Sequence, residues 1–134
     1  MKINFNITRQ EFGINLLRLG LAAVFLWFGF SQLFDSLRWV SIVPSWAVNF
    51  LSIPPAMIVM ANGAFEVILA GALAMGFFVR IISFILGLHL VVIAFEFGFT
   101  ATGIRDFGLV IASFALSLIY TKDELNMEEV LISK

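Results

Sequence analysis

One apolar stretch constrains the fold of this chain more than any other feature. From Ala56 to Val79 the sequence runs for 24 residues with a single ionisable side chain, Glu66, near its middle. A helix rises about 1.5 Å per residue, so this run can cross a bilayer core of about 30 Å. Glu66 is therefore expected deep in the membrane. A charged side chain at that depth costs about 2.5 to 3.5 kcal/mol on insertion scales, so we expect it to be paired, protonated or functional.

Composition extends the membrane prediction to the whole chain. Of its 134 residues, 61% are hydrophobic and only 13% are charged. A soluble domain of this size cannot bury so much apolar surface. The formal net charge of -1, without a basic stripe, argues against nucleic-acid binding. The sequence contains no cysteine, which excludes disulfides, thiolate metal sites and thiol redox chemistry within the chain.

The apolar runs predict an all-α integral membrane protein with one domain over residues 1–134. Four membrane-spanning helices are predicted at residues 12–34, 56–79, 81–99 and 104–120, followed by an acidic tail at 121–134. Residues 35–55 hold three prolines and two tryptophans, which favours a short interfacial or re-entrant segment between the first two spans. The second and third spans are joined so tightly, at Arg80, that they are expected to be antiparallel neighbours in a four-helix bundle.

Positive charges predict the orientation of the bundle, because four spans place both termini on one side. Six Lys and Arg residues lie on the terminal side or in the turn between the second and third spans, and two lie on the opposite side. The first set is Lys2, Arg9, Arg18, Arg80, Lys122 and Lys134, and the second set is Arg38 and Arg105. Cytoplasmic loops carry the excess of positive charge. We therefore expect both termini in the cytoplasm, in a prokaryotic-type cytoplasmic membrane.

Small and polar residues predict the inward face of each helix. Residues three or four apart share a helix face, and small side chains let membrane helices approach closely. The stripes are Arg18, Ala22, Phe25, Gly29 and Gln32 in the first span, Gly63, Glu66, Ala70 and Ala74 in the second, and Arg105, Gly108, Ala112 and Ala115 in the fourth. We expect a bundle with a polar interior, surrounded by Phe, Leu, Ile and Val side chains that face lipid.

Glu66 and His89 are the candidate catalytic residues. Measured along their helices, the two lie within about two turns of each other in height, and Arg18 enters from the terminal side with a side chain able to reach toward Glu66. In the functional interpretation, Glu66 exchanges a proton beside a quinone or another small ligand, and His89 binds a quinone carbonyl or relays the proton. In the structural interpretation, Glu66 pairs with Arg18 or is a neutral acid bonded across helices, and His89 makes a plain interhelical hydrogen bond.

Five further polar residues are candidates for ligand binding: Arg18, Gln32, Asn62, Arg105 and Asp106. Arg105 and Asp106 open the fourth span. They are either a structural lock, with Arg105 reaching Glu96 and Asp106 favouring the helix N-terminus, or an anion or headgroup site. No metal or haem is expected, because the chain has one histidine and Glu96 stands roughly 10 Å from His89 along their helix.

Four pieces of the sequence together resemble the DoxX family of small membrane proteins. They are RLGLAAVFLWFGFSQL (Arg18–Leu33), NGAFEVILAGALAMGFFVRI (Asn62–Ile81), the region around His89, and GIRDFGLVIASFALSL (Gly103–Leu118). The residues at matching places are Arg18, Gly29, Glu66, Gly76, Arg80, Arg105 and Asp106. Many relatives have Lys where this chain has Gln32, so a role that needs a cation at this position is not expected here.

The resemblance implies several classes of function. The family name comes from the membrane part of a thiosulfate:quinone oxidoreductase, and related four-helix proteins look like redox partners, assembly factors or cargo receptors. We therefore expect a quinone-linked subunit of a membrane redox system, which needs a bound quinone and a partner oxidoreductase. The alternatives are a non-enzymatic assembly protein that holds a partner's transmembrane helix, and a small proton-coupled transporter, for which a homodimer would supply a second half.

Overall fold

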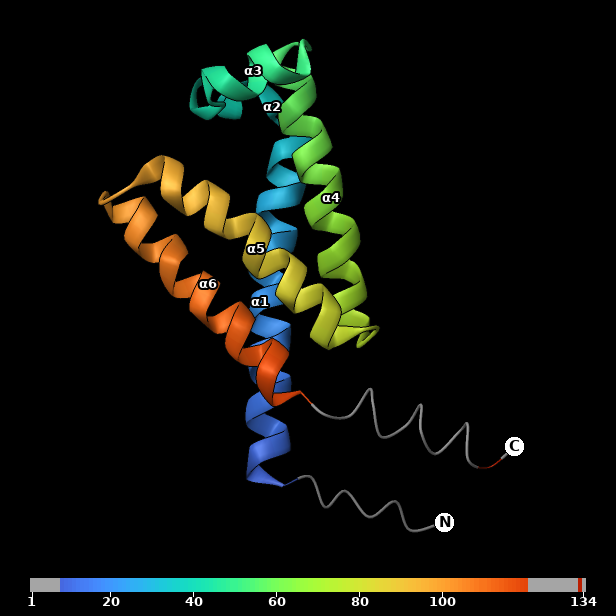
Figure 1. Cartoon of the computed structure of the whole chain (residues 1–134). Helices are drawn as coiled ribbons and strands as arrows, with labels where there is room; N and C mark the ends of the chain where they lie inside the picture. The colour runs from blue at the N-terminus through green and yellow to red at the C-terminus, as the bar shows by residue number, and fades with distance from the viewer. Residues whose placement is uncertain (1–7, 121–132, 134) are drawn as a thin grey trace.

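The computed structural model describes residues 8–120 and Ser133, and the regular structure within them is helical. It has four long helices, α1 (Arg9–Phe34), α4 (Pro55–Met75), α5 (Val79–Phe97) and α6 (Ala101–Ile119), as Figure 1 shows. Each of the four is long and apolar enough to cross a membrane. The predicted four-helix membrane fold is confirmed. The predicted acidic tail at 121–134 lies outside the described residues apart from Ser133.

The first helix, α1, begins three residues before the predicted span because its first turn is capped. The Oγ1 atom of Thr8 accepts a hydrogen bond from the backbone N–H of Glu11 at 3.2 Å, and the Glu11 carboxylate accepts one from the backbone N–H of Thr8 at 2.9 Å. This capping box satisfies N–H groups that a helix N-terminus leaves without a helical partner. The polar residues before the apolar run therefore belong to the helix.

A short helical segment connects α1 with α4. It consists of α2 (Ser36–Trp39), a 3-10 turn, η1 (Val40–Ile42), and α3 (Ser45–Leu51). The segment lies across the end of the α1–α4 pair, opposite to the end where α1 begins (Figure 1). Trp39 Nε1 donates to Ser31 Oγ at 3.0 Å, and Trp46 Nε1 donates to Glu96 Oε1 at 2.7 Å. The predicted short segment between the first two spans is present, and it is helical.

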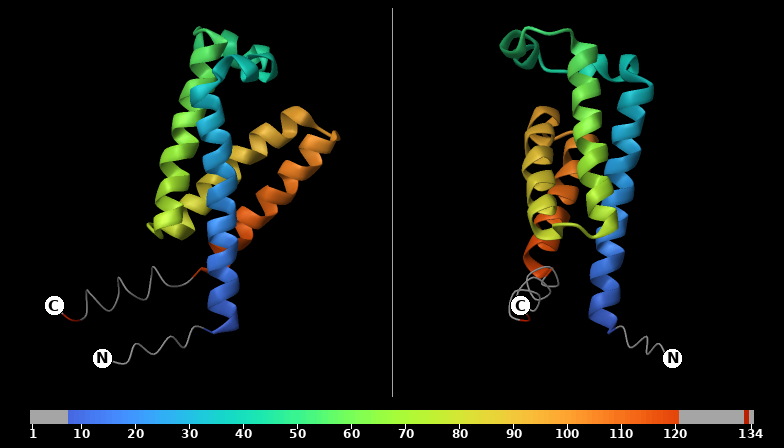
Figure 2. Two further views of the ribbon diagram at one scale, coloured as in Figure 1. Left: turned by 180° about the vertical axis from the view of Figure 1, so that it is seen from behind. Right: turned by 90° about the vertical axis from the view of Figure 1, so that its right-hand side faces the viewer.

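The long helices form two close pairs, α1 with α4 and α5 with α6, and Figure 2 shows that the second pair crosses the first obliquely. The second and third spans are in contact, as expected, but they do not form one of the two close pairs. Helix α4 ends at Met75, and Gly76 and Phe78 then take left-handed conformations, with φ values of 83° and 44°. Gly76 tolerates this conformation because it has no Cβ. The turn directs α5 away from α4 and onto α6.

Glycine residues form the closest contact between α1 and α4. A Cβ atom built on Gly63 would lie 2.7 Å from the carbonyl oxygen of Gly29, and one built on Gly29 would lie 2.9 Å from the carbonyl oxygen of Gly63. Small residues at this crossing therefore let the two backbones touch. The buried residues are Leu21, Ala22, Phe25, Gly29 and Gln32 on α1 and Val59, Gly63, Glu66, Ala70 and Leu73 on α4. The predicted inward faces of these two helices are confirmed.

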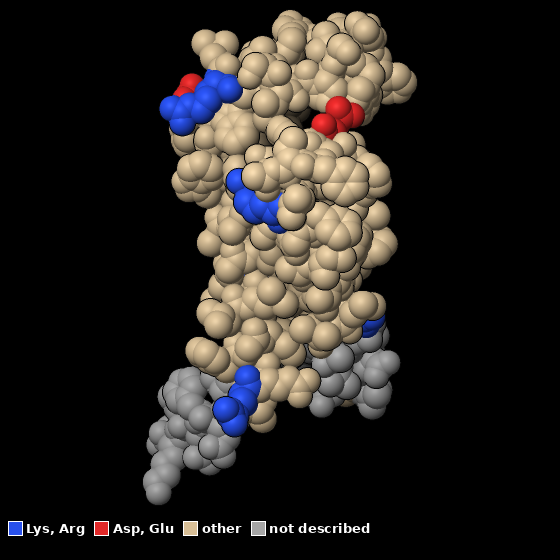
Figure 3. Space-filling view, turned by 90° about the vertical axis from the view of Figure 1, so that its left-hand side faces the viewer, with Lys and Arg blue, Asp and Glu red and all other residues tan. Residues whose placement is uncertain are grey.

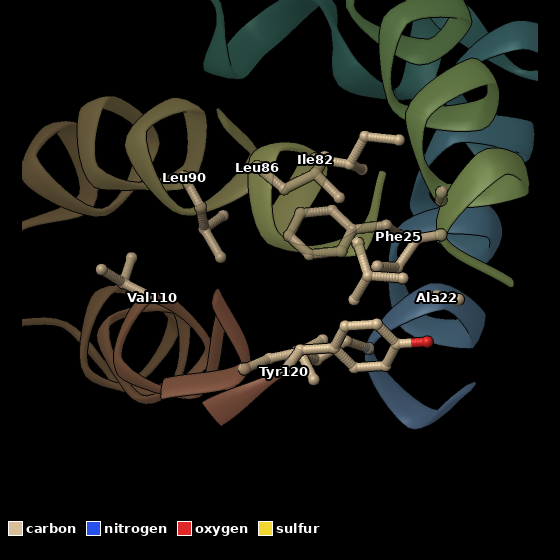
Figure 4. Close-up of a cluster of buried hydrophobic side chains, with 12 residues drawn as sticks. Ala22, Phe25, Ile82, Leu86, Leu90, Val110 and Tyr120 are labelled. Carbon is tan, nitrogen blue, oxygen red and sulfur yellow. The ribbon is translucent and has the colours of Figure 1, made fainter. Parts of the chain in front are cut away.

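The inward face of α6 differs from the prediction. Its buried residues are Gly103, Asp106, Val110, Ser113 and Leu116. The predicted stripe through Gly108 is wrong, because Gly108 is exposed and nothing lies within 4 Å of a Cβ atom built on it. Figure 4 shows Val110 among the buried apolar side chains, together with Phe25 of α1 and Leu86 of α5. The inward face combines branched residues, Val110 and Leu116, with the small residues Gly103 and Ser113, which the predicted stripe did not include.

Charged side chains lie toward the two ends of the molecule. On the face drawn in Figure 3, a broad band of uncharged side chains separates the charged groups near one end from those near the other. Helix α1 begins and α6 ends at the same end of the bundle (Figure 1), as an even number of spans requires. Three members of the charge count, Lys2, Lys122 and Lys134, lie outside the described residues.

Candidate functional site

Glu66 faces α1 at a place where the two helices are held close together. The contact between Gly29 and Gly63 lies about one turn away from Gln32 on α1 and from Glu66 on α4. Both polar side chains are nearly inaccessible, with 7% of Gln32 and 3% of Glu66 exposed. Residues spaced by three share a helix face. The glycines thus bring the backbones close enough for the two side chains to meet inside the bundle.

Four residues from three helices form a hydrogen-bonded group that we call the Glu66 cluster: Gln32, Asn62, Glu66 and His89. Gln32 Nε2 donates to Glu66 Oε2 at 3.3 Å. Asn62 Nδ2 donates to Glu66 Oε1 at 3.1 Å and to Gln32 Oε1 at 2.7 Å. His89 Nε2 lies 3.3 Å from Glu66 Oε1. Both carboxyl oxygens therefore have partners, and every partner is an amide or an imidazole.

The contact between Glu66 and His89 suits proton exchange. An imidazole nitrogen can donate a proton to a carboxylate oxygen or accept one from a carboxyl group, so the contact persists with the proton on either side. The two members differ in access, since 21% of the His89 side chain and 3% of the Glu66 side chain are exposed. Phe65 lies beside the imidazole, with the two ring centroids 4.8 Å apart. The sequence placed Glu66 and His89 at similar heights, and the structure brings the two side chains into contact.

Arg18 does not reach Glu66, so the predicted pair between them is wrong. Its Nη1 atom donates to the carbonyl oxygens of Leu73 at 2.7 Å and Ala74 at 2.6 Å, and Nη2 donates to Asn15 Oδ1 at 3.3 Å. The last carbonyl groups of a helix have no helical partner and carry a partial negative charge. The last carbonyl groups of α4 lie at the same end of the bundle as Arg18, and its guanidinium binds them instead of Glu66.

Arg80 makes a similar contact at the end of α6. Its Nε atom donates to the carbonyl oxygen of Ser117 at 3.3 Å, and Ser117 Oγ donates back to the carbonyl oxygen of Arg80 at 2.8 Å. Two cations at the terminal end of the bundle, Arg18 and Arg80, thus each bind carbonyl groups near the C-terminus of another helix. Such contacts stabilise helix ends.

Asp106 is paired with its neighbour Arg105 near the other end of the bundle. Its Oδ1 atom accepts from Arg105 Nε at 2.9 Å and Nη2 at 2.8 Å, and only 5% of Asp106 is exposed. The predicted contact of Arg105 with Glu96 is wrong, because Glu96 accepts from Trp46 instead. The predicted role of Asp106 at the helix N-terminus is also wrong. Thr100 is the N-cap, and Asp106 lies beyond the first turn, where the free N–H groups are.

A small cavity of about 70 Å³ lies between the Glu66 cluster and the Arg105–Asp106 pair. Its polar lining residues are Gln32, Trp39, Glu66, Thr102, Arg105 and Asp106. Sequence reasoning treated the two groups as separate, because the distances along each helix do not reveal a space shared by all four long helices. It also missed the aromatic lining by Phe28 and Trp39. Within residues 8–120, no three His, Asp or Glu side chains are placed to hold a metal ion.

Comparison with known proteins identifies the family. The chain matches the family model described as DoxX over residues 13–101, which is well over half of its length. The match contains every member of the Glu66 cluster and ends where α6 begins, so Arg105 and Asp106 lie outside it. No curated protein and no solved structure matches the chain. The sequence match and the four-helix fold agree, and the chain belongs to the DoxX family.

Proposed function

We propose that this protein is the quinone-linked subunit of a membrane redox system, in which the Glu66 cluster exchanges a proton with the quinone. One observation carries the proposal. A carboxyl group with 3% exposure touches a histidine whose side chain is 21% exposed. A proton can therefore pass between a buried acid and a group that a ligand dissolved in the bilayer can reach.

The exposed part of His89 fits a quinone headgroup. An imidazole nitrogen can donate a hydrogen bond to a carbonyl or accept one from a hydroxyl, and these are the polar groups of the oxidised and reduced forms. Phe65, which is 38% exposed and has its ring centroid 4.8 Å from that of His89, adds an aromatic face beside it. A bound quinone would supply two-electron chemistry, with the electrons passing to a partner oxidoreductase.

The residues of the Glu66 cluster have separate roles in this proposal. Gln32 and Asn62 orient the Glu66 carboxyl group through their amide N–H groups. A proton that His89 accepts passes across the 3.3 Å contact from Nε2 to Glu66 Oε1. The amides do not change their protonation state. Each transfer into the cluster therefore raises its charge by one unit and leaves the hydrogen-bond framework in place.

Mass spectrometry of copurifying small molecules tests the proposal. The full chain would be extracted into nanodiscs with its native lipids, as wild type and as Glu66→Ala, His89→Ala and Glu96→Ala variants. Glu96 is the matched control because it is an acid outside the cluster, bonded to Trp46. We expect stoichiometric quinone with wild type and Glu96→Ala, and its loss from the other two. Bulk phospholipid alone in every sample would overturn the quinone assignment.

We also propose that the end carrying Arg9, Arg18 and Arg80 faces the cytoplasm. The described positive side chains at the opposite end are Arg38 and Arg105, so the bias follows the positive-inside rule. Because the sequence has no cysteine, single cysteines can report the side directly. In intact cells, a membrane-impermeant maleimide should label a Ser41→Cys variant and spare Gln10→Cys. The reverse pattern would invert the orientation.

A second candidate function is a non-enzymatic assembly protein that holds a partner's transmembrane helix. The observation that favours it is an apolar hollow of about 360 Å³ between α5 and α6, lined by residues that include Val91, Phe95, Ile104 and Phe107. A photo-reactive amino acid at position 104 should then crosslink one stoichiometric membrane protein in native membranes. The same group at position 68, also on an exposed apolar residue, serves as the control. Equal, diffuse crosslinking from both would remove this candidate.

A further inference from the structure

The small cavity inside the bundle is lined by residues of all four long helices and by Trp39 of α2. Two buried carboxyl groups line it, Glu66 and Asp106, and they are 3% and 5% exposed. The ionisable residues that line it are these two and Arg105. His89 touches Glu66 from α5 and is not part of the lining. The cavity therefore joins the proposed proton-exchanging acid to Asp106 and to Arg105, whose side chain is 54% exposed.

Asp106 has an oxygen atom that the protein does not satisfy. Both contacts from Arg105 go to Oδ1. Among the described residues, the structure gives Oδ2 no hydrogen bond. Among the described residues, the fully buried side-chain atom without a hydrogen-bond partner is Arg18 Nε, so Asp106 Oδ2 keeps some accessible surface where a water can bind it. At the opposite end, Gln32 Nε2 uses one N–H for Glu66 and has a second one to donate. Both ends of the cavity thus offer hydrogen-bonding capacity to water.

The size of the cavity suits water as its occupant. Its volume is about 70 Å³, and roughly 10 to 15 Å³ of such volume is enough for one water molecule. Several waters therefore fit between Glu66 and Asp106. Apolar side chains such as Phe25, Leu90 and Leu109 form much of the rest of the wall, so the polar lining residues are the groups that such waters can bind.

We propose that this cavity holds a chain of waters that carries protons between Glu66 and the membrane side opposite to the start of α1. The inference deepens the proposed function and rests on it for the source of the proton. Asp106 Oδ2 binds the last water, and Arg105, with its Cζ atom 5.4 Å from the ring centroid of Phe28, holds the aspartate at the mouth. A proton that leaves Glu66 passes from water to water and exits past Asp106. One proton moves, and no electron is transferred.

Single cysteines in this cysteine-free chain test whether the cavity is wet. Leu109→Cys and Ile93→Cys place thiols in the cavity wall, and Ile111→Cys and Val92→Cys place them on exposed apolar positions of the same helices. The readout is the rate of reaction with Ag⁺ in nanodiscs. Thiolates form in water, so the cavity cysteines should react at least about tenfold faster than their neighbours. Equal rates would show a dry cavity and overturn the proposal.

A plug at the Asp106 end tests the direction of the route. Thr102 lines the cavity there, and Thr102→Trp should slow the reaction of Leu109→Cys about tenfold while leaving Val92→Cys unchanged, since only the former depends on water in the cavity. An unchanged rate for Leu109→Cys would mean that water enters elsewhere. Circular dichroism of each variant confirms that the helices are intact before rates are compared.

Infrared spectroscopy tests whether protons use the route. The carboxyl band of Glu66, identified by subtracting the spectrum of Glu66→Gln, would be followed after a rapid drop in pH. Wild type should protonate at least about tenfold faster than Thr102→Trp, because confined water conducts the proton. Equal rates, or a Glu66 band that never forms while the protein stays folded, would overturn the proposal.

None of these readouts needs quinone, so the two proposals can fail separately. Reactive cavity cysteines without copurifying quinone would leave the water route and remove the redox function. Copurifying quinone with unreactive cavity cysteines would leave the redox function and remove the water route.

Discussion

Among residues 8–120, two carboxyl groups are buried, and they differ in the charge of their hydrogen-bond partners. Glu66 is surrounded by the amides of Gln32 and Asn62 and by the imidazole of His89, whereas Asp106 is bound by the guanidinium of Arg105. The partners of Glu66 need no fixed charge, so the cluster can hold or lose a proton without breaking an ion pair. The partner of Asp106 is always a cation. One site is built to change its charge and the other to keep it.

The largest effect should come from breaking the helix crossing that assembles the Glu66 cluster. A Cβ on Gly63 would lie 2.7 Å from Gly29 O, while one on Gly71 of the same helix meets nothing within 4 Å. Gly63→Ala should therefore lower the free energy of unfolding by about 3 kcal/mol, as overpacking against a rigid backbone does. Thermal unfolding in detergent, with Gly71→Ala as control, measures it. Equal melting temperatures would show that the crossing adapts.

Replacing each carboxyl group by its amide should show that the two groups contribute differently to stability. Asp106→Asn leaves Arg105 without its anion and should cost about 1 to 3 kcal/mol, in the range of hydrogen bonds to charged groups. Glu66→Gln keeps a side chain of the same shape among amide partners and should cost about 1 kcal/mol or less. Denaturant titrations of both variants compare them, and quinone content should fall only in Glu66→Gln. A larger loss of stability for Glu66→Gln would mean that Glu66 is a structural brace.

A third substitution tests whether Arg18, a permanent cation, affects the carboxyl group of Glu66. Arg18→Lys removes the fork that binds two carbonyl oxygens of α4 and should cost about 0.5 to 1 kcal/mol, as cations at helix C-termini contribute. It should leave the infrared band of Glu66 unchanged. Arg9→Lys, at an exposed position, is the control. A shifted Glu66 band in Arg18→Lys would show that Arg18 does interact with Glu66, as the sequence suggested.

The smallest effect should come from loosening the segment that lies over the bundle. Trp46→Phe removes the hydrogen bond to Glu96, and because this contact is exposed it should cost about 0.5 kcal/mol. Hydrogen exchange of residues 45–51 should become faster, while exchange near Glu66 stays the same. Trp27→Phe, at a position 63% exposed, provides the comparison. Faster exchange throughout α4 would show that the segment also supports the Glu66 cluster.

The sequence was sufficient to predict the four spans and the inward faces of α1 and α4. Long apolar runs identify membrane helices, and Gly29 and Gly63 mark a close crossing because small residues are required there. The same rule failed for α6, where Val110 and Leu116 fill the contact and Gly108 faces outward. Small residues permit close approach, but they do not require it.

Partners within the site were harder to predict than positions. Glu66 and His89 were expected only at similar heights. The spacing of four residues between Asn62 and Glu66 was a signal for the contact of these two residues that could have been used. The choice of Arg18 between Glu66 and the end of α4 depends on where α4 stops, which the left-handed turn at Gly76 decides. The cavity depends on how the four long helices meet, so no single helix predicts it.

The pairing of the helices has a consequence for how the chain is made. Each close pair, α1 with α4 and α5 with α6, joins long helices that follow one another along the chain. Contacts between elements near in sequence form faster than distant ones, and chains fold from the N-terminus as they are synthesised. All residues that hold the Gly29–Gly63 crossing exist once Met75 has been added. The first hairpin, with three of the four members of the Glu66 cluster, can therefore assemble in the membrane while α5 and α6 are still inside the ribosome.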